Sequence, residues 1–539
     1  MGNIFIFDYL SKLVGFFIVL FTLLIFIYSL NFIKTKKKEY YYWMFLTFLS
    51  SLGVVFSNHL FLITIFWGYL GLTLFMLINL YSDQNKASVA KKTFIIVGGS
   101  DGFLLFGILL YIYLTSRYFI VEKPLVINSA LSFLSFFLIA LACFAKAGCI
   151  PLHTWIPEMA EVTEAPTVAY LPASLDKLLG IYLLVRLIKD AFILDDFSKA
   201  ILLILGSLTI IAAVMMALVQ HNIKKLLGYH AVSQVGYMVL GLGCSTVLGL
   251  AAGLFHMLNN AIYKSCLFLG VGNVQKQSGS VEFENLSGLG KFMPATFLFV
   301  LIASLSISGI PPFNGFVSKW MVYQGLVELF KLSTSFTLKL VILFSLVSAL
   351  VGSSLTLASF LKLNAGVFLG QPKEKTKEAS FTLLISPFIL SLLCIIFGIF
   401  AFHTILPFIA KAIGEFSTSG LWRPMQATNL IILGILLGFI IFIITSKKRR
   451  TSPIFIGGEK IDFQTEAKVS DFYVNIRELK VLKNIYRLAE KKFFDIYEQT
   501  KNLSFIFIKF LRYLHNGVLP TYLVWCLLGA LWLFFIFFR

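Results

Sequence analysis

The sequence has few charged residues, and most of those it has are basic. Only 13% of the 539 residues are Asp, Glu, Lys or Arg, whereas 58% are hydrophobic and the mean hydropathy is +0.88. This composition excludes an ordinary soluble domain and predicts a chain that crosses a membrane many times as helices. A net charge of +19 could suit a nucleic-acid-binding protein, but the basic residues cluster in short loops between apolar runs. We therefore expect the lipid bilayer as a partner, and no nucleic acid.

The sequence also lacks the motifs that hold redox centres and nucleotides. Its six cysteines are scattered, each in or beside an apolar run, and no CxxC pair occurs. Such spacing argues against disulfide frameworks, zinc sites and iron–sulfur clusters. Neither a GxGxxG nor a Walker A motif is present. We expect no cofactor and no redox centre in this chain, so electron transfer or nucleotide chemistry would belong to partner chains.

Apolar runs long enough to cross the bilayer predict about 14 membrane helices. The first, roughly 9–33, has no small-residue cleavage site, so we interpret it as a retained helix. The run 40–81 must hold two helices, with a polar break at Ser57–His59. The other spans are expected near 93–115, 127–147, 164–188, 199–219, 225–243, 246–271, 293–330 (broken), 336–362, 379–404, 427–446 and 519–538.

Basic loops alternate with nearly neutral ones along the chain, and this sets the predicted orientation. The basic side has KTKKKE (34–39), Lys86, Lys91, Lys92, Lys224, Lys225, KEKTK (373–377) and KKRR (447–450). The positive-inside rule makes this side cytoplasmic. We expect the plasma membrane of a prokaryote as the location.

One long polar region, 451–515, interrupts the series of spans. From Asp471 to His515 apolar residues recur in steps of three and four, which predicts an amphipathic helix. We expect a long helix, continuous or kinked, along the cytoplasmic membrane face, with two helices broken near Gln499–Asn502 as the alternative. Gly517 and Pro520 would end it before the final span.

Seven ionisable residues lie inside the predicted spans, where a charge costs about 2.5–3.5 kcal/mol on insertion scales. They are Asp101, Lys146, Asp176, Lys177, His256, Lys264 and Lys319. Intramembrane ionisable groups indicate ion pathways. The alternatives are a lysine that snorkels to the headgroups, an aspartate that only pairs with a lysine, and a histidine that is an ordinary core residue. Lysine suits proton transfer, because a buried lysine changes its protonation readily whereas arginine stays charged.

Two patterns connect these residues. His256, Asn260 and Lys264 are four apart, so they share one helical face and suit a hydrated proton path. Lys146 lies five residues before a proline, and Lys319 follows a Pro-Pro pair, so each lies beside an interrupted helix, one in each half of the chain. Paired interrupted helices are typical of inverted repeats with ion sites at mid-membrane depth.

Five motifs together resemble a known family: KAGCIPLHTWIPEMAE, SLDKLLGIYLLVR, HNIKKLLGYHAVSQVGYM, HMLNNAIYKSCLFL and GIPPFNGFVSK. They resemble the proton-translocating antiporter-like subunits of respiratory complex I, of Mrp-type cation/proton antiporters and of energy-converting membrane-bound NiFe hydrogenases. The resemblance covers roughly 40–446. WGYLGLTLF and LHNGVLPTY look closest to the hydrogenase-type members.

The resemblance implies an all-α polytopic fold with two inverted five-helix repeats, each a half-channel with a broken helix. A C-terminal amphipathic lateral helix and a final membrane helix follow. The expected parts are an N-terminal helix in 1–39, repeats in 40–188 and 189–335, further helices in 336–450, the lateral helix in 451–518 and the last helix in 519–539.

The resemblance also assigns roles by position. Lys146 matches the family's central lysine, Lys177 the lysine of the next helix, Lys264 the lysine that links the halves, with His256 beside it, and Lys319 the terminal lysine or glutamate.

One expected acid is missing. Relatives have a glutamate after a tryptophan, opposite the central lysine, but here Gly68 follows Trp67. We expect Asp101 to replace that glutamate, with Asp176 as the alternative or as a group that tunes Lys177.

The expected function is translocation of H+, or exchange of Na+ for H+, within a redox-driven membrane complex, with an energy-converting hydrogenase favoured. Other membrane subunits and peripheral redox subunits would be its partners. The alternatives are a subunit of a complex I-like dehydrogenase, a subunit of a redox-independent Mrp-type antiporter, and a structural scaffold with vestigial lysines.

Overall fold

The computed structural model describes residues 3–80, 84–373, 375–418, 424–446 and 472–538. They divide into two compact units, Met1–Arg477 and Glu478–Arg539. The described residues are mostly helical, and the one sheet among them pairs β1 (Leu125–Val126) with β2 (Phe192–Ile193) in parallel. KKRR (447–450) and most of the polar region that follows lie outside the described residues.

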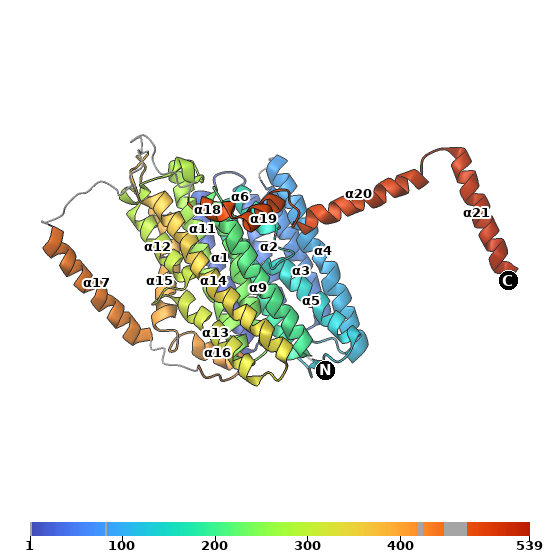
Figure 1. Cartoon of the computed structure of the whole chain (residues 1–539), viewed down its shortest axis with the longest axis horizontal. Coiled ribbons are helices and arrows are strands. Elements are labelled where there is room, and N and C mark those ends of the chain that lie inside the picture. Colours follow the sequence, from blue (N-terminus) through green and yellow to red (C-terminus); the bar gives the residue numbers. More distant parts are fainter. Residues whose placement is uncertain (1–2, 81–83, 374, 419–423, 447–471, 539) are drawn as a thin grey trace. The chain divides into compact units, whose positions relative to one another are not determined.

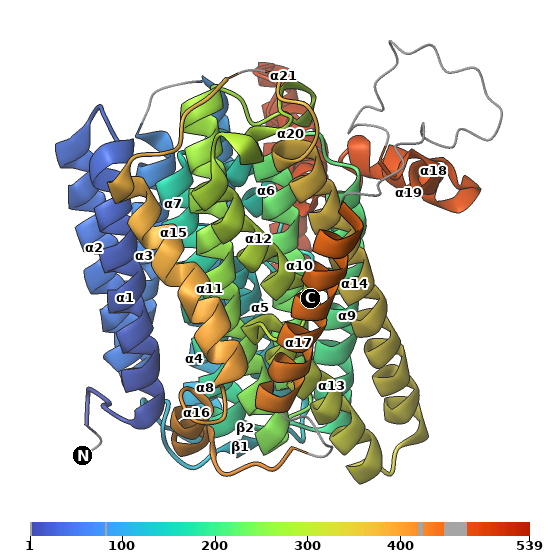
Figure 2. The same ribbon diagram turned by 90° about the vertical axis from the view of Figure 1, so that its left-hand side faces the viewer.

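The first unit consists of helices, and most of its long ones run side by side as a bundle (Figures 1 and 2). Its helices are α1 (Tyr9–Phe32), α2 (Lys37–Phe56), α3 (Leu60–Asn79), α4 (Gln84–Thr115), α5 (Ala130–Ala147), α6 (Trp155–Val162), α7 (Ala165–Tyr170), α8 (Asp176–Arg186), α9 (Asp196–Leu218), α10 (Ile223–Gly243), α11 (Val247–Ser278), α12 (Pro294–Ser308), α13 (Asn314–Leu332), α14 (Phe336–Phe368), α15 (Phe381–Ile399), α16 (Leu406–Ile413) and α17 (Pro424–Ser446).

Ten helices in the described ranges are long and apolar enough to cross a membrane, which agrees with the predicted polytopic fold. Two further helices, α10 and α11, are buried along almost their whole length. Because their surroundings are protein rather than lipid, they tolerate more polar residues than a lipid-facing helix does. The two helices predicted in 40–81 are confirmed, since α2 ends at Phe56 and α3 begins at Leu60.

Both predicted helix interruptions are present. The first separates α5 from α6, and the second separates α12 from α13. Each first half ends at a glycine in the left-handed region, Gly148 with φ +82° and Gly309 with φ +79°, where a residue with a Cβ is strained. The inverted relation between 40–188 and 189–335 stays a prediction.

The predicted span 164–188 contains an irregular turn. A π-helical turn, Leu171–Leu175, joins α7 to α8, and a second one, Leu187–Ala191, follows α8. Pro172 lies in the first of these turns and has no N–H for a regular helical bond. The turn directly precedes Asp176 and Lys177, so it determines which way their side chains point.

The C-terminal segment is helical but divided. It forms α18 (Val474–Glu478), α19 (Lys480–Glu490), α20 (Ile496–Leu514) and α21 (Leu519–Phe537). The alternative break near Gln499–Asn502 is wrong, because α20 runs through these residues without interruption. The helical structure is interrupted instead after α19, where Lys492 has φ +57° and Asp495 caps α20.

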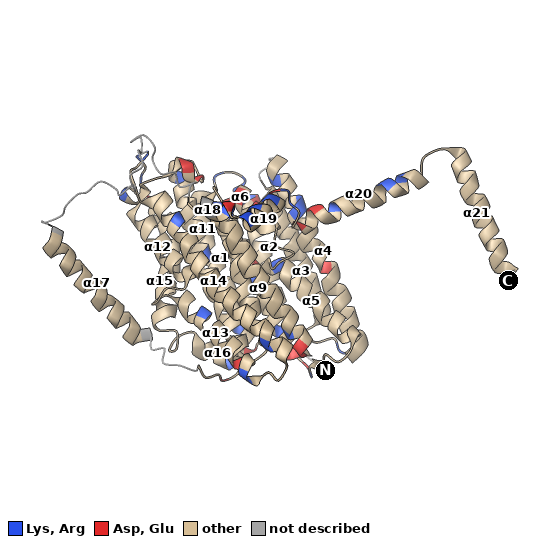
Figure 3. Cartoon of the chain, viewed as in Figure 1, with Lys and Arg blue, Asp and Glu red and all other residues tan. Residues whose placement is uncertain are grey.

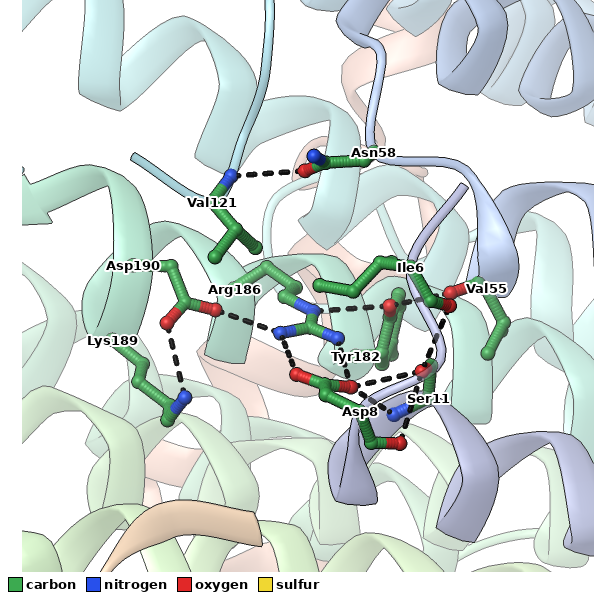
Figure 4. A network of polar contacts seen from close by, with 10 residues as sticks. All are labelled: Ile6, Asp8, Ser11, Val55, Asn58, Val121, Tyr182, Arg186, Lys189 and Asp190. Atoms are coloured by element: carbon green, nitrogen blue, oxygen red, sulfur yellow. Dashed lines mark hydrogen bonds and ion pairs between the residues drawn. The ribbon is translucent and has the colours of Figure 1, made fainter. Parts of the chain in front are cut away.

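A buried arginine joins the N-terminal segment to the end of α8 (Figure 4). Arg186 is 1% exposed, and its guanidinium donates to both carboxylate oxygens of Asp8 at 2.7 Å. It also donates to Asp190 at 2.8 Å and to the Tyr182 hydroxyl at 3.0 Å. Burial raises the pKa of the Asp8 carboxyl, but the hydrogen bonds and charge of Arg186, with bonds from Ser11, lower it to about 2.

We predict that Asp8→Asn lowers the free energy of unfolding by about 1–3 kcal/mol at pH 7, because a buried guanidinium loses its charged acceptor. Since the pKa of Asp8 is about 2 when folded and about 3.9 when unfolded, its contribution is complete above about pH 4 and is lost towards pH 2. Thermal unfolding of wild type and variant in detergent, from pH 7 down to pH 2, tests this. Equal unfolding midpoints at pH 7 would contradict it.

Candidate functional site

The polar residues predicted to share one face of α11 are buried in the bundle. His256, Asn260 and Lys264 are each 0% exposed. The Lys264 ammonium donates to the Leu227 carbonyl at 2.8 Å, so it lies inside the bundle and not at the lipid headgroups. His256 Nδ1 shares a hydrogen bond with the Ser318 hydroxyl at 2.9 Å. The Asn260 amide has no hydrogen-bond partner among the described residues.

Lys146 occupies the last turn of α5, directly before the first interruption, and is 0% exposed. Its ammonium lies 4.9 Å from the ring centroid of Trp67 on α3. Within the described ranges, Lys146 Nζ has no hydrogen-bond partner. A buried ammonium over an aromatic face is stabilised by the ring quadrupole, but less than by a carboxylate.

Asp101 of α4 lies against the part of α3 where the missing glutamate would be. A Cβ on Gly68 would be 3.8 Å from Asp101 Oδ2, and a Cβ on Gly71 would be 3.7 Å from the same oxygen. The charge of this carboxylate acts on Lys146. The position of Asp101 therefore suits the predicted replacement.

Asp176 and Lys177 begin α8 and are both buried. The Lys177 ammonium donates to the carbonyl of Ala147, the last residue of α5. The charge of Asp176 acts on both Lys146 and Lys177. The structure thus brings Asp176 within electrostatic reach of both lysines, so it can serve either of the two roles predicted for it.

Lys319 lies after the second interruption, in α13, and is 2% exposed. Its ammonium donates to the Ile307 carbonyl in the last turn of α12 at 2.9 Å, and it lies 4.7 Å from the ring centroid of Tyr237. In both interrupted helices, therefore, a lysine binds a carbonyl at the end of the first half. Such carbonyls lack helical partners and bear the negative end of the helix dipole.

By its contacts, the counterpart of Lys319 is Lys177 rather than Lys146. Gly148 and Gly309 leave room for these two lysines: a Cβ would lie 3.2 Å from Lys177 Nζ in one break and 3.1 Å from Lys319 Cδ in the other. The sequence pattern pairs Lys146 with Lys319, because both lie near prolines, but Lys146 belongs to α5 itself and does not cross the interruption.

Polar residues of α10, which were not predicted, complete the site. His230 is 0% exposed, and its Nε2 shares a hydrogen bond with the Ser359 hydroxyl at 2.7 Å. Gln234 accepts from the Tyr263 hydroxyl at 3.3 Å. His230, Gln234 and Tyr237 recur in steps of four and three, and this polar stripe could have been found within HNIKKLLGYHAVSQVGYM.

Charged residues elsewhere lie mostly towards the helix ends of the first unit (Figure 3). On the predicted cytoplasmic side, α6 is fixed by ion pairs from Lys92 to Glu158 at 2.7 Å and from Lys225 to Glu161 at 2.8 Å. Across the described ranges, no three His, Cys, Asp or Glu side chains gather as a group that could hold a metal ion. The arrangement suits proton transfer between buried lysines, two acids and histidines.

The family model described as "NADH:quinone oxidoreductase/Mrp antiporter, TM" matches residues 57–347, more than half of the chain. The Na+/H+ antiporter subunit A1 of Staphylococcus epidermidis is 30% identical over 405 residues, which cover 70% of this chain and 50% of the relative. Formate hydrogenlyase subunit 3 of Escherichia coli (strain K12) is 34% identical over 328 residues, covering 57% of this chain and 53% of the relative. The chain thus spans about half the length of these curated relatives.

A similar solved structure is that of a chain from the membrane-bound sulfane sulfur reductase, an archaeal respiratory membrane complex. The TM-score is 0.79 at 23% identity, and the match covers 97% of this chain and 88% of the other. At this identity the likeness concerns the fold alone, and it extends well beyond the family match. From the family match and the relatives, we conclude that the chain belongs to the NADH:quinone oxidoreductase/Mrp antiporter family of membrane subunits, as its five motifs predict.

Proposed function

We propose that this chain translocates H+, alone or in exchange for Na+, as the antiporter-like subunit of a larger membrane complex. The observation that supports this most is the burial of four lysines, Lys146, Lys177, Lys264 and Lys319, in one helical bundle. A lysine that serves only to anchor a helix would lie at the membrane surface. Relatives named as subunits of a Na+/H+ antiporter and of formate hydrogenlyase support the same class of function.

Electrostatic coupling between neighbours gives the lysines a way to act in sequence. The charges of Asp101 and Asp176 act on Lys146, and the charge of Lys177 acts on Lys264. If a partner's charge draws Asp101 away from Lys146, the ammonium loses a counter-charge and releases its proton. The gain or loss of one proton then changes the proton affinity of the next lysine.

The second half supplies groups that can pass the proton on. His256 hydrogen-bonds to Ser318, the residue before Lys319. Its Nε2 lies 3.5 Å from the Tyr263 hydroxyl. Because imidazole accepts a proton on one nitrogen and donates from the other, a histidine between buried lysines suits proton relay. Na+ would instead need a cage of carboxylate and carbonyl oxygens, in which Asp101 or Asp176 could take part.

We propose a redox-driven complex of the hydrogenase type in the plasma membrane of a prokaryote, with peripheral redox subunits as partners. The relative named formate hydrogenlyase subunit 3, 34% identical over 328 residues, supports this, and the likeness in fold to the sulfane sulfur reductase chain, over 97% of this chain, includes the C-terminal helices. We place α19 and α20 along the cytoplasmic membrane face, where an amphipathic helix is stable. The similarity to an Mrp-type subunit keeps a redox-independent antiporter as the second candidate.

Purification of the native complex separates these two candidates. A redox-driven hydrogenase would contain nickel and iron in stoichiometric amounts, measured by elemental analysis of the purified complex. A metal-free assembly of membrane subunits alone would identify the antiporter. Mass spectrometry of the co-purifying chains names the partners in either case.

We predict that Lys146→Ala and Lys319→Ala each reduce coupled ion transport by about tenfold or more, because the relay loses a proton carrier. Transport by the reconstituted complex is the measurement, and native gels verify assembly. Lys331→Ala, an exposed lysine on the same helix as Lys319, is the matched control. Unchanged transport in both variants would favour a structural scaffold, and loss of assembly would make these lysines structural.

We predict that Asp101→Asn reduces transport as strongly as loss of Lys146, because the replacement counter-charge disappears. Adding Gly68→Glu to this variant should restore part of the activity, since a Cβ at Gly68 would have only Asp101 Oδ2, at 3.8 Å, within 4 Å. Asp196→Asn, at an exposed carboxylate, is the control. Wild-type transport in Asp101→Asn alone would refute the replacement.

We predict that removal of residues 471–539 weakens the association of this chain with neighbouring subunits. The segment contains α20 and α21, which have no buried residues within their own unit, so their apolar side chains can contact partners. Native gels and co-purification measure the loss. An intact and fully coupled complex after truncation would show that the segment does not hold the assembly together.

A further inference from the structure

A second polar stripe runs along α14, and the proposed relay does not use it. Its members are all buried and are spaced by multiples of about one helical turn, so they share one face. They are Ser345, Ser348, Thr356, Ser359 and Lys362. The stripe faces α9 and α10: Ser345 accepts a hydrogen bond from Ser207 of α9 at 2.9 Å, and Ser359 bonds with His230 of α10 at 2.7 Å.

At Ser359 the stripe reaches His230 of α10 and comes close to Lys264 of α11. The His230 and Phe360 rings lie 4.8 Å apart between centroids, and the Lys264 ammonium lies 5.7 Å from the same Phe360 ring. His230 and Lys264 therefore border one aromatic side chain next to Ser359. The second ring nitrogen of His230, Nδ1, is buried without a hydrogen-bond partner among the described residues. This histidine thus has one nitrogen bonded to the stripe and one free to exchange a proton.

Lys362 lies one turn beyond Ser359, towards the predicted cytoplasmic side. It is 1% exposed, and its ammonium donates to the carbonyls of Leu218 at 2.9 Å and Gln220 at 3.0 Å. Gln220 is partly exposed and lies in the connection between α9 and α10, beside the basic pair at 224–225. The stripe therefore leads from a surface loop to the neighbourhood of Lys264.

We propose that Lys362, Ser359 and His230 form a proton path between the cytoplasmic face and Lys264, separate from the groups around Lys146. The inference rests on the proposed ion translocation, because it supplies a second connection for the same relay. A proton taken up at Lys362 passes to the Ser359 hydroxyl, which accepts one proton and gives up another. His230 takes that proton on Nε2 and releases one from Nδ1 towards Lys264, so the number of protons is conserved at each step.

A purely structural role would explain some of these contacts. The Lys362 ammonium lies at the C-terminal end of α9, where a cation is favourable. Ser359 supplies a hydrogen-bond partner to the buried imidazole of His230. Under that explanation, an arginine at 362 would serve equally well, because it keeps the charge and the donors. An arginine cannot release its proton in a protein, so the two explanations predict opposite results for Lys362→Arg.

The first experiment tests whether the path is open to the cytoplasm. The experiment uses the intact complex in inside-out vesicles. Cys526→Ser is the background, because Cys526 is the exposed native thiol among the described cysteines. On this background, Lys362→Cys and Ser359→Cys are each treated with a small cationic methanethiosulfonate. We expect both to be labelled, the first faster. Ser345→Cys, on the same stripe but more than three turns further along α14, should stay unlabelled. An unlabelled Ser359→Cys would overturn the path.

The second experiment tests whether the path is used. We expect Lys362→Arg and His230→Gln to reduce transport at least about fivefold in assembled complexes, because neither replacement relays a proton. Ser345→Ala should retain wild-type transport. Wild-type transport in Lys362→Arg would overturn the proposal, even if both cysteines are labelled. If Lys362→Arg transports normally but Lys146→Ala and Lys319→Ala do not, only this path is refuted. If all three variants transport normally, the proposed function itself is refuted.

Discussion

The architecture depends on one constraint: an ammonium group inside a membrane protein needs an acceptor that lipid cannot supply. For three of the four lysines the acceptors are backbone carbonyls, whereas Lys146 has no hydrogen-bond partner among the described residues and lies over the Trp67 ring. Lys177 binds Ala147, Lys319 binds Ile307, and Lys264 binds Leu227. The Ala147 and Ile307 carbonyls lie at the ends of interrupted helices and are available because no following turn uses them. Interrupting a helix therefore creates a binding position for a cation without placing a permanent anion there.

Neutral acceptors leave the proton affinity of each lysine sensitive to its surroundings. A lysine paired permanently with a carboxylate would stay protonated, because the ion pair strongly favours the charged form. Here Asp176 acts on both Lys146 and Lys177, and Asp101 acts on Lys146 as well, whereas Lys264 and Lys319 are held by carbonyls. The two halves of the chain therefore present different electrostatic environments to similar lysines, and under the proposed function this difference would give proton movement a direction.

Much of this could be predicted from the sequence, because charges and prolines in apolar runs are conspicuous. The break at 57–59, the two interruptions and the buried lysines all follow from single residues that lipid would not tolerate. The correspondence of Lys177 with Lys319 could not be predicted, since it depends on a π-helical turn that rotates the start of α8. The α14 stripe was missed because serines are common in membrane helices and become informative only beside His230.

Gly148 and Gly309 have a consequence for how such a protein can be tuned. Each contributes no charge and no side chain, yet each lies within van der Waals range of a lysine side chain. A Cβ at Gly148 would also lie 2.0 Å from Ile156 Cδ1, and a Cβ at Gly309 would lie 3.1 Å from Lys319 Cδ; at both positions the positive φ strains any residue with a Cβ. Substitution of either glycine would therefore change the backbone of the interruption together with the position of the lysine, so these two positions limit how far the sites can vary even where every titratable residue stays the same.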